Sequence, residues 1–289
     1  MSSSTLTINQ SARVRRAIGN YIRGFFAVLV TLVMVFPLYW LISTALKTEA
    51  ETMSAQIVFW PAVPQFNNFT YAMTKVPLMR YFFNTLIITV MQMASELFLG
   101  TMAAYAFSKG RFYGKHTLFL LVLGAMMIPI QVTFVPLYIM VARAGFMSSY
   151  IGVWIAGCIS SYTIFMLRQA FMSLDDSYLE AARVDGMNKF GVIFRIMVPM
   201  CKPTMITVGL TAFIGGWNNY FWPKIIIKDA NMYVLTVGVQ RLKNTFGAET
   251  VSNYHQIMAG LLLSIIPIFI VFAIFQRHML SGFTKAAMK

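Results

Sequence analysis

A polar segment at residues 180–199 contains the side chains best suited to chemistry in this chain. Its carboxylate at position 180 can accept hydrogen bonds from an Arg or Lys of another protein, and the small residues beside it allow close approach. We interpret the segment as a docking surface for a soluble partner, because an apolar stretch flanks it on each side. Its positions are Glu180, Ala181, Ala182, Asp185, Gly186, Ile196 and Pro199.

The alternative interpretation of this segment is an ordinary connecting loop. In that case Glu180 would pair with Arg183 three residues later, which contributes about 0.2–0.5 kcal/mol. An isolated Glu-Ala-Ala would favour the ordinary loop. The glycine at its spacing and the Ile-x-Val-Pro ending at residues 196–199 favour docking instead.

Local signals predict a first short helix in this segment. Ser173 and Asp176 have capping-box-like spacing, so we expect the helix to run from about residue 174 to 185. Gly186 then accepts the left-handed backbone that ends a helix without steric cost. The chain should therefore turn at this glycine.

A second, amphipathic helix should follow the turn. Asn188 is placed to cap it, and prolines at 199 and 203 should end it and start the next apolar stretch. The helix should lie along the membrane with its apolar face inward. That face would consist of Phe190, Ile193, Phe194 and Met197.

Composition identifies the chain as an integral membrane protein. Hydrophobic residues make up 58% and charged residues 11%, whereas soluble domains carry about 25% charged residues. A helix needs about 20 apolar residues to cross a bilayer core of about 30 Å. We therefore predict an all-α fold with six transmembrane helices. They should lie near residues 24–46, 82–107, 117–141, 150–172, 204–226 and 256–276.

The distribution of Lys and Arg predicts that both termini are cytoplasmic. Fifteen of the 23 basic residues fall on the side of the N-terminus, and basic residues favour cytoplasmic connections. The predicted organisation is a cytoplasmic segment at 1–23, a membrane domain at 24–276 and a cytoplasmic tail at 277–289. The docking loop, at about 173–203, then lies in the cytoplasm.

Several classes of function find little support in the sequence. The net charge of +14 lies at the ends of the spans rather than on one face of a soluble fold, which argues against nucleic-acid binding. The three histidines lie in three different connections, so we expect no metal site. Residues 110–116 come nearest to a phosphate-binding loop, but the glycine spacing is wrong and the Ser or Thr is missing.

The segment at 180–199 closely resembles the cytoplasmic EAA loop of importer permeases of the ATP-binding-cassette (ABC) superfamily. The family pattern is EAA-x3-G-x9-I-x-L-P, and the sequence matches it without gaps, with Val198 in place of the usual Leu. The resemblance extends over nearly the whole chain and is strongest to the carbohydrate-uptake branch, in particular the six-span second permease of maltose-type systems. Further family-like stretches are residues 36–39, 103–108, 126–129 and 216–223.

This resemblance implies a type I importer permease fold with a cytoplasmic coupling-helix elbow, in a bacterial-type inner membrane. The partners it implies are a second permease subunit, which we expect to be a different chain, two ATPase subunits and an external solute-binding protein. ATP and Mg would be bound by the ATPases, and this chain would hold no cofactor. Within the elbow, Glu180 would be the charged anchor and Gly186 the turn.

The solute path and the contact with the binding protein rest on weaker signals. Aromatic rings that stack on sugars and amides that bond hydroxyls cluster in the fifth span, although an aromatic belt at the membrane interface explains them equally well. These candidates are Trp217, Asn218, Asn219, Tyr220 and Trp222. In the outer connection at 227–255, which we expect to be a loop, the candidates for binding-protein contact are Arg241, Asn244, Gly247 and Glu249. A plain connector is the alternative there.

Two other classes of protein compete with the importer permease. An ion-gradient-driven secondary transporter usually needs acids or broken helices at the middle of the membrane, and Glu96 is the main candidate here. We expect a structural role for Glu96, paired or protonated between helices. A membrane-embedded enzyme would need convergent His, Asp, Glu or Cys residues, which the sequence lacks.

Overall fold

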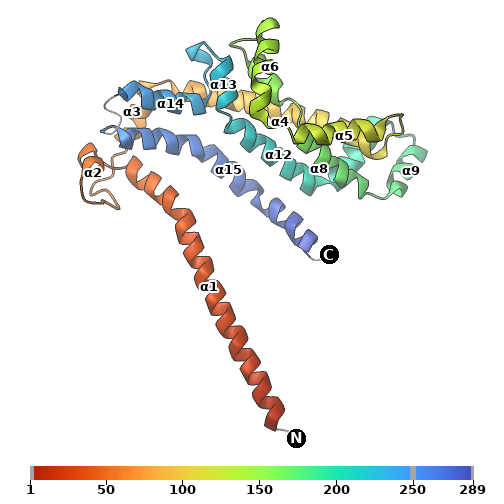
Figure 1. Ribbon diagram of the computed structural model, residues 1–289, viewed down its shortest axis with the longest axis horizontal. Helices are drawn as coiled ribbons and strands as arrows, with labels where there is room; N and C mark the ends of the chain where they lie inside the picture. The colour runs from red at the N-terminus through yellow and green to blue at the C-terminus, as the bar shows by residue number, and fades with distance from the viewer. Residues whose placement is uncertain (1–2, 248–251, 288–289) are drawn as a thin grey trace. The chain divides into compact units, whose positions relative to one another are not determined.

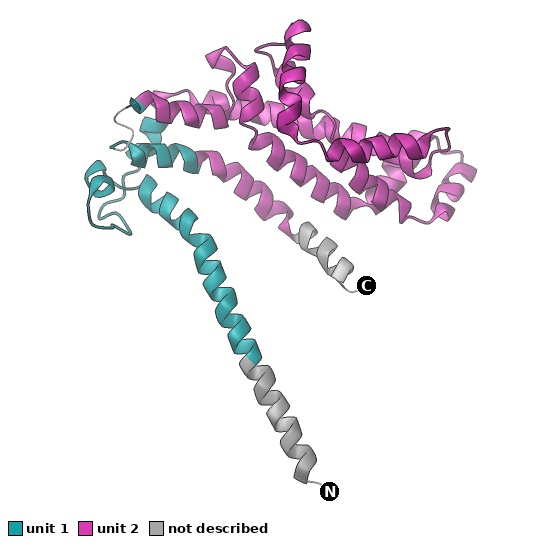
Figure 2. Ribbon diagram, in the orientation of Figure 1, with its two compact units in different colours: residues 1–72, 246–262 teal, residues 73–245, 263–289 magenta. Residues whose placement is uncertain are grey.

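The computed structural model describes residues 3–247 and 252–287, and these residues form helices and connecting segments without any strand. Side chains are described for residues 19–247 and 252–276. The chain forms two units, one of residues 1–72 with 246–262 and the other of residues 73–245 with 263–289 (Figure 2). The helices of each unit are described separately below.

The first unit is built around the end of a long apolar helix. Helix α1 (Ser3–Ala45) contains a possible membrane span at Gly19–Ala45 with a mean hydropathy of 2.5. Helix α2 (Glu49–Met53) follows and starts with a capping box between Thr48 and Glu51. The unit also includes most of helix α3 (Asn67–Lys75) and the start of helix α15 (Tyr254–Ala287).

The second unit is organised around helix α4 (Leu78–Lys109), which packs against α8 (Ser161–Met172) and α12 (Lys202–Trp217) (Figure 1). Small residues bring α4 and α8 together. A Cβ at Gly100 of α4 would stand only 2.6 Å from Cγ2 of Thr163 on α8. The Thr163 hydroxyl donates a hydrogen bond to the carboxylate of Glu96, one turn earlier on α4. The buried acid thus pairs with a neighbouring helix, as predicted.

The structure contains three helices that could cross a membrane without a break, and three further candidates that are bent pairs. The continuous candidates are Gly19–Ala45, Leu78–Lys109 and Tyr254–Gln276. If each bent pair counts as one span, the described residues provide up to six, which agrees with the predicted number. The cytoplasmic orientation of both termini stays a prediction.

The third and fourth predicted spans are not single straight helices. Helix α5 (Lys115–Met126) and helix α6 (Ile130–Arg143) meet at 103°, because Pro129 cannot continue the hydrogen-bonding pattern of α5. Helix α7 (Tyr150–Trp154) continues into the 3-10 turn η1 (Ile155–Gly157), and this pair meets α8 at 47°, where Ser160 caps α8. Apolar composition alone does not reveal such bends.

The connection predicted as an outer loop contains a regular helix. After α12 come α13 (Phe221–Ile226), the 3-10 turn η3 (Ala230–Met232) and helix α14 (Leu235–Phe246). Valine and leucine side chains of α14 are buried, whereas its lysine, arginine and asparagine side chains are exposed. The prediction of an irregular loop was therefore wrong for this part. The polar and glycine residues that suggested a loop occupy the exposed face and the ends of an amphipathic helix.

We predict that Gly100→Val destabilises the second unit. The added side chain would overlap Thr163, and overpacking of a close contact costs about 1–3 kcal/mol. The midpoint of thermal unfolding of the purified chain in detergent should fall. Gly124→Val is the matched control, since a Cβ at Gly124 has no heavy atom within 4 Å among the described residues. Equal losses in the two variants would show that the contact with Thr163 is not responsible.

Candidate functional site

The first helix of the elbow is α9 (Asp176–Val184), and Asp175 caps it. The carboxylate of Asp175 accepts a hydrogen bond from the backbone N–H of Ser177 at 2.9 Å, and this bond lowers the pKa of Asp175. The prediction that Ser173 is the cap was wrong. Helix α8 extends to Met172, so Ser173 ends that helix, and its hydroxyl donates to the carbonyl of Ala170 at 2.8 Å.

Gly186 forms the turn, as predicted. Its φ of +76° lies in the left-handed region. The N–H of Gly186 donates to the carbonyl of Arg183 at 3.0 Å, and the N–H of Met187 donates to the carbonyl of Ala182 at 2.9 Å. This pair of bonds is a Schellman motif, which satisfies carbonyl groups left free at the end of α9. The turn is therefore hydrogen-bonded and well defined.

The second helix of the elbow begins at the predicted cap. The side chain of Asn188 accepts a hydrogen bond from the N–H of Gly191 at 2.8 Å. Helix α10 (Lys189–Gly191) continues into the π-helical segment η2 (Val192–Met197) and then α11 (Val198–Met200). The direction of the chain then changes by 89° before α12 starts, with Pro203 in its first turn. The predicted elbow is confirmed, with a π-helical middle.

The apolar face of this second helix differs from the predicted one. Ile193 and Met197 are buried, but Phe190 is 57% exposed and Phe194 is 37% exposed. Val192 is buried instead. The π-helical turn widens the helix by one residue per turn, so side chains that would share one face of a regular α-helix no longer align.

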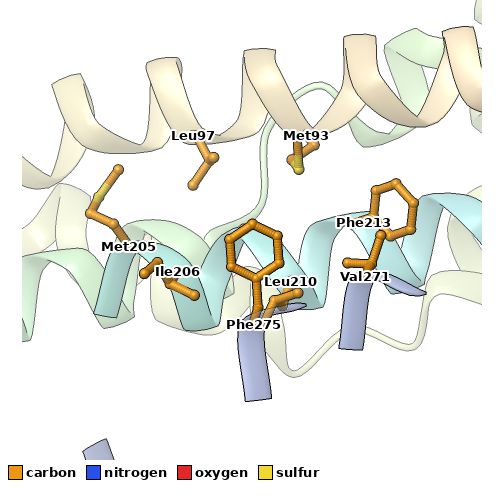
Figure 3. Close-up of a pocket in the computed structure, with 9 residues that line it drawn as sticks. Met93, Leu97, Met205, Ile206, Leu210, Phe213, Val271 and Phe275 are labelled. Atoms are coloured by element: carbon orange, nitrogen blue, oxygen red, sulfur yellow. The ribbon is translucent and has the colours of Figure 1, made fainter. Parts of the chain in front are cut away.

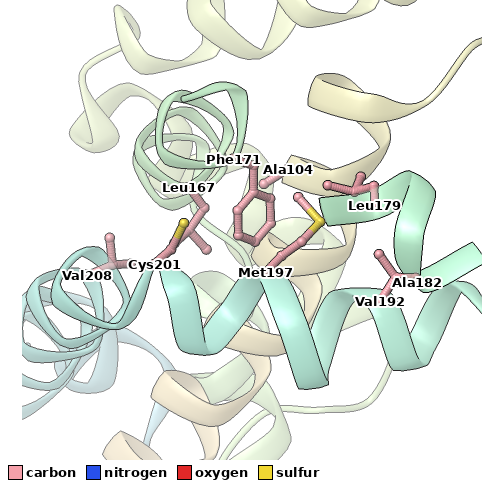
Figure 4. Packing of buried hydrophobic residues seen from close by; sticks show 9 residues of the cluster. All are labelled: Ala104, Leu167, Phe171, Leu179, Ala182, Val192, Met197, Cys201 and Val208. Carbon is pink, nitrogen blue, oxygen red and sulfur yellow. The ribbon is translucent and has the colours of Figure 1, made fainter. Parts of the chain in front are cut away.

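The inner face of α9 packs against the helical core of the second unit (Figure 4). Leu179 and Ala182 are buried there with Phe171 of α8, Ala104 of α4 and Met197 of η2. Ala182 is only 3% exposed, so the expectation that both alanines form the docking surface was wrong for this one. It is small because α9 lies close to the second helix of the elbow.

The outer face of α9 is the part open to a partner. Glu180, Ala181 and Asp185 are exposed, and Val184 is 88% exposed. Among the residues that the structure describes, no ion pair joins Glu180 to Arg183, so the pairing expected of an ordinary loop is absent. The carboxylate of Glu180 therefore remains available. Of the other two predicted positions, Ile196 is half-buried and Pro199 is exposed.

Lys109, at the end of α4, holds the start of the elbow in place. Its ammonium donates to the carbonyl of Leu174 at 2.8 Å and to the carboxylate of Asp176 at 2.5 Å. Sequence reasoning counted Lys109 only as a basic residue at the end of a span. The signal for this role was its position as the last residue of a long apolar helix that leads to the cytoplasmic side in the predicted topology.

The two tryptophans of the predicted solute path are packing residues within this chain. Trp217 is 1% exposed, and its indole N–H donates to the carbonyl of Ser264 at 3.0 Å. Trp222 is 2% exposed, and its indole N–H donates to the carbonyl of Gly152 at 3.0 Å. Both rings are enclosed and both N–H groups are satisfied. The exposed or half-exposed members of the predicted group are Asn218, Asn219 and Tyr220.

A cavity of about 400 Å³ lies between α4, α12 and α15 of the second unit (Figure 3). Its lining is apolar and includes Met93, Leu97, Leu210, Phe213 and Phe275. Binding sites for polar ligands carry a few well-placed hydrogen-bonding groups. This cavity has none among its lining side chains, so it is not suited to a polyhydroxy solute.

The predicted contacts for an external binding protein lie on or after α14. Arg241 is exposed, with its guanidinium carbon 5.1 Å from the centroid of the Tyr233 ring. Asn244 is exposed and accepts a hydrogen bond from Gln240 at 3.4 Å. Gly247 is exposed, and its φ is +51°. Glu249 lies outside the described residues.

No group of three or more His, Cys, Asp or Glu side chains that could hold a metal ion occurs in the part of the chain that the structure describes. Cys158 and Cys201 are free thiols. The candidate site is therefore the elbow formed by α9 and the helix after it, with the outer face of α9 exposed.

Comparison with known proteins identifies permease proteins of sugar transport systems as relatives of this chain. The AraQ permease protein of an arabinooligosaccharides transport system from Bacillus subtilis is 30% identical over 267 residues, covering 91% of this chain and 94% of AraQ. The LacG permease protein of a lactose transport system from Rhizobium radiobacter is 26% identical, covering 93% and 96%. A crystal structure of a bacterial ABC transporter involved in alginate import contains a chain with the same fold, with a TM-score of 0.79 and 23% identity, covering 92% and 97%.

The family model for the inner membrane component of binding-protein-dependent transport systems matches residues 96–285, which include the whole elbow. The match covers more than half of the chain, and the relatives are permease proteins rather than enzymes or ion-driven transporters. The chain therefore belongs to the family of binding-protein-dependent transport system inner membrane components, as a multi-pass permease subunit.

Proposed function

We propose that this permease forms half of the path for a sugar or related polyhydroxy solute. The names of its relatives support a carbohydrate, since they include transport systems for arabinooligosaccharides and lactose. One relative belongs to an sn-glycerol-3-phosphate system, so a polyol derivative is also compatible with the family. Asn218, Asn219 and Tyr220 are the candidates for contact with the solute, because their side chains are not enclosed by this chain.

The exposed outer face of α9 is the observation that carries the coupling role. In this proposal, Glu180 and Ala181 contact a cleft on a cytoplasmic ATPase, and a cationic side chain of the ATPase pairs with Glu180. Two such ATPases bind the ATP and Mg, while the second permease is a different chain. An external solute-binding protein delivers the solute and contacts Arg241 and Asn244 of α14. Both termini then lie in the cytoplasm, with 1–23 and 277–289 as cytoplasmic segments.

The packing beneath α9 provides a route from the ATPase to the membrane helices. Leu179 and Ala182 are buried against α4 and α8, and Lys109 joins the end of α4 to the start of the elbow. A closely packed interior transmits displacement rather than absorbing it. Movement of α9 when the ATPases close would therefore displace α4 and α8 and change access to the solute path.

We expect Glu180→Lys and Gly186→Pro to abolish coupling without preventing membrane insertion. The first change would place a cation opposite the cation of the ATPase. The second is incompatible with the φ of +76°, because proline holds φ near about −65°. The measurement is copurification of the ATPases and the second permease with this chain in mild detergent, followed by the solute-stimulated ATPase activity of the complex.

The control for this experiment is Glu49→Lys, which makes the same charge change on α2, in the other unit. It should copurify with the ATPases and retain stimulated hydrolysis. Normal copurification and normal transport by both elbow variants would refute the docking role of α9.

A further prediction separates the two bonds of Lys109. Asp176 is 71% exposed at its side chain, so its ion pair should contribute less than about 1 kcal/mol. Lys109→Met also removes the bond to the carbonyl of Leu174 and should loosen the elbow more than Asp176→Asn does. The ratio of transport to ATP hydrolysis should fall clearly in Lys109→Met and little in Asp176→Asn. Equal effects would assign the whole role to the ion pair.

A further inference from the structure

A small polar cavity in the first unit has no part in the function proposed so far. Its volume is about 220 Å³, and it lies where the end of α1, helix α2 and the start of α15 meet. Its walls carry both hydrogen-bonding groups and aromatic rings. The residues used in the argument below are Trp40, Thr44, Lys47, Glu51 and Tyr254.

Two polar side chains of this cavity have no hydrogen-bond acceptor or donor within the described ranges, and the hydroxyl of one of them, Thr44, is fully buried. Lys47 is 2% exposed, and its ammonium lies 4.0 Å from the centroid of the Trp40 ring, but it has no acceptor or ion-pair partner within the described ranges. Thr44 is also 2% exposed, and its hydroxyl has no partner there either. A buried polar group left unpaired costs about 1–3 kcal/mol. The unpaired Thr44 hydroxyl and the Lys47 ammonium, which contacts only the Trp40 ring, both line this cavity, and together they indicate a site that a ligand completes.

The third polar group of the cavity is held in a fixed position. One carboxylate oxygen of Glu51 accepts from the N–H of Ala62 at 2.8 Å, and the other accepts from the N–H of Thr48 at 2.9 Å. A carboxylate offers about four lone-pair sites, so Glu51 retains capacity for a donor of the ligand. The pKa of Lys47 is lowered, because burial has a larger effect than the nearby Glu51 carboxylate, which acts in the opposite direction.

The charges and the size of the cavity define the class of ligand. The cation of Lys47 and the anion of Glu51 balance each other, which favours a neutral ligand that has both donors and acceptors. Hydroxyl groups meet this requirement. Tyr254 is 40% exposed and offers a ring face for C–H groups, since the ammonium of Lys47 already covers the Trp40 ring. The volume is below the 300–1,000 Å³ typical of drug-sized ligands, so about one ring fits.

We propose that this cavity binds a single neutral sugar ring, with Lys47 and Thr44 donating to its hydroxyls and Glu51 accepting from one. In the proposed orientation the site lies at the outer end of the first span, and it is formed by residues of the first unit only. It is a subsite where the solute contacts the permease before it enters the path. The inference rests on the proposed transport of a sugar.

Saturation-transfer NMR on the full chain in lipid nanodiscs tests the site directly. The probes are methyl α-D-glucopyranoside and methyl α-L-arabinofuranoside, with sodium acetate as a probe for carboxylate binding. At least one glycoside should receive saturation from the wild-type protein, and titration should give its Kd. Lys47→Met, which keeps an unbranched apolar stem over Trp40, should weaken binding about tenfold or more through loss of a charged hydrogen bond.

Thr44→Val is the second variant, and it separates a loss of ligand binding from a loss of folding. Valine has nearly the same shape and removes a buried hydroxyl that has no protein partner, so the thermal midpoint should not fall. Its affinity for the glycoside should nevertheless decrease several-fold. The control is Lys228→Met, which removes an exposed lysine in the other unit and should bind the glycoside as the wild type does.

Three results would overturn the proposal. They are no saturation transfer from either glycoside, unchanged affinity in both Lys47→Met and Thr44→Val, and binding of acetate that depends on Lys47 while neither glycoside binds. The last result would instead identify a site for a carboxylate group.

A separate experiment distinguishes failure of this site from failure of the proposed function. The assembled complex in proteoliposomes should import its sugar in an ATP-dependent manner that Glu180→Lys abolishes. If such import occurs while the glycosides fail to bind the cavity, the subsite is refuted and the importer function stands. If no sugar is imported, the proposed function itself is refuted.

Discussion

The close approach of α4 and α8 is the constraint on which the second unit depends. At Gly100 the two helices leave room for a hydrogen atom and little more, since a Cβ would meet Thr163 at 2.6 Å. Association of helices in a membrane relies on such packing, because burial of apolar surface from lipid provides no driving force. The elbow then begins where α8 ends, and Lys109 at the end of α4 binds its first residues. Helix α9, whose outer face we propose as the docking surface, is thus fixed to the packed helices.

Some buried polar side chains of this protein are paired within the chain, whereas others line a cavity. In the second unit, Glu96 receives a hydrogen bond from Thr163, and the indole N–H groups of Trp217 and Trp222 donate to backbone carbonyls. These groups stabilise contacts between helices and need nothing from outside. In the first unit, Thr44 and Lys47 line a cavity, and the buried hydroxyl of Thr44 has no partner in the described part of the chain. The contrast is why we assign packing to the first set and ligand binding to the second.

The apolar cavity and the polar cavity of this protein are suited to different ligands. The larger cavity, with Met93 and Phe213 in its lining, has no group that could orient a polar solute. A sugar would lose its bonds to water there and gain none in return, at a cost for each buried hydroxyl. Its volume of about 400 Å³ exceeds the 220 Å³ of the polar cavity, so volume alone would favour the apolar cavity of the two. The smaller cavity carries hydrogen-bonding groups, and for this reason we propose it as the site for a sugar.

Local chemistry made the elbow largely predictable from sequence. Gly186 ends a helix because only a residue without a Cβ adopts the left-handed backbone freely, and Asn188 caps the next helix through its own side chain. Each of these features depends on residues close together in the chain. The error at Ser173 arose because this residue ends α8 directly after the apolar stretch, so that Asp175, two residues later, caps α9.

The sequence by itself determined the membrane class, the family and the turn at Gly186, because composition and short-range backbone preferences do not depend on distant contacts. Tertiary structure decided which alanine of the EAA segment is free, since Ala182 is buried only through contacts with α4, α8 and η2. It also decided the 103° bend between α5 and α6, the burial of Trp217 and the pairing of Lys109 with Leu174. These features join residues that lie far apart in the chain or depend on the path of whole helices, and neither composition nor local spacing contains that information.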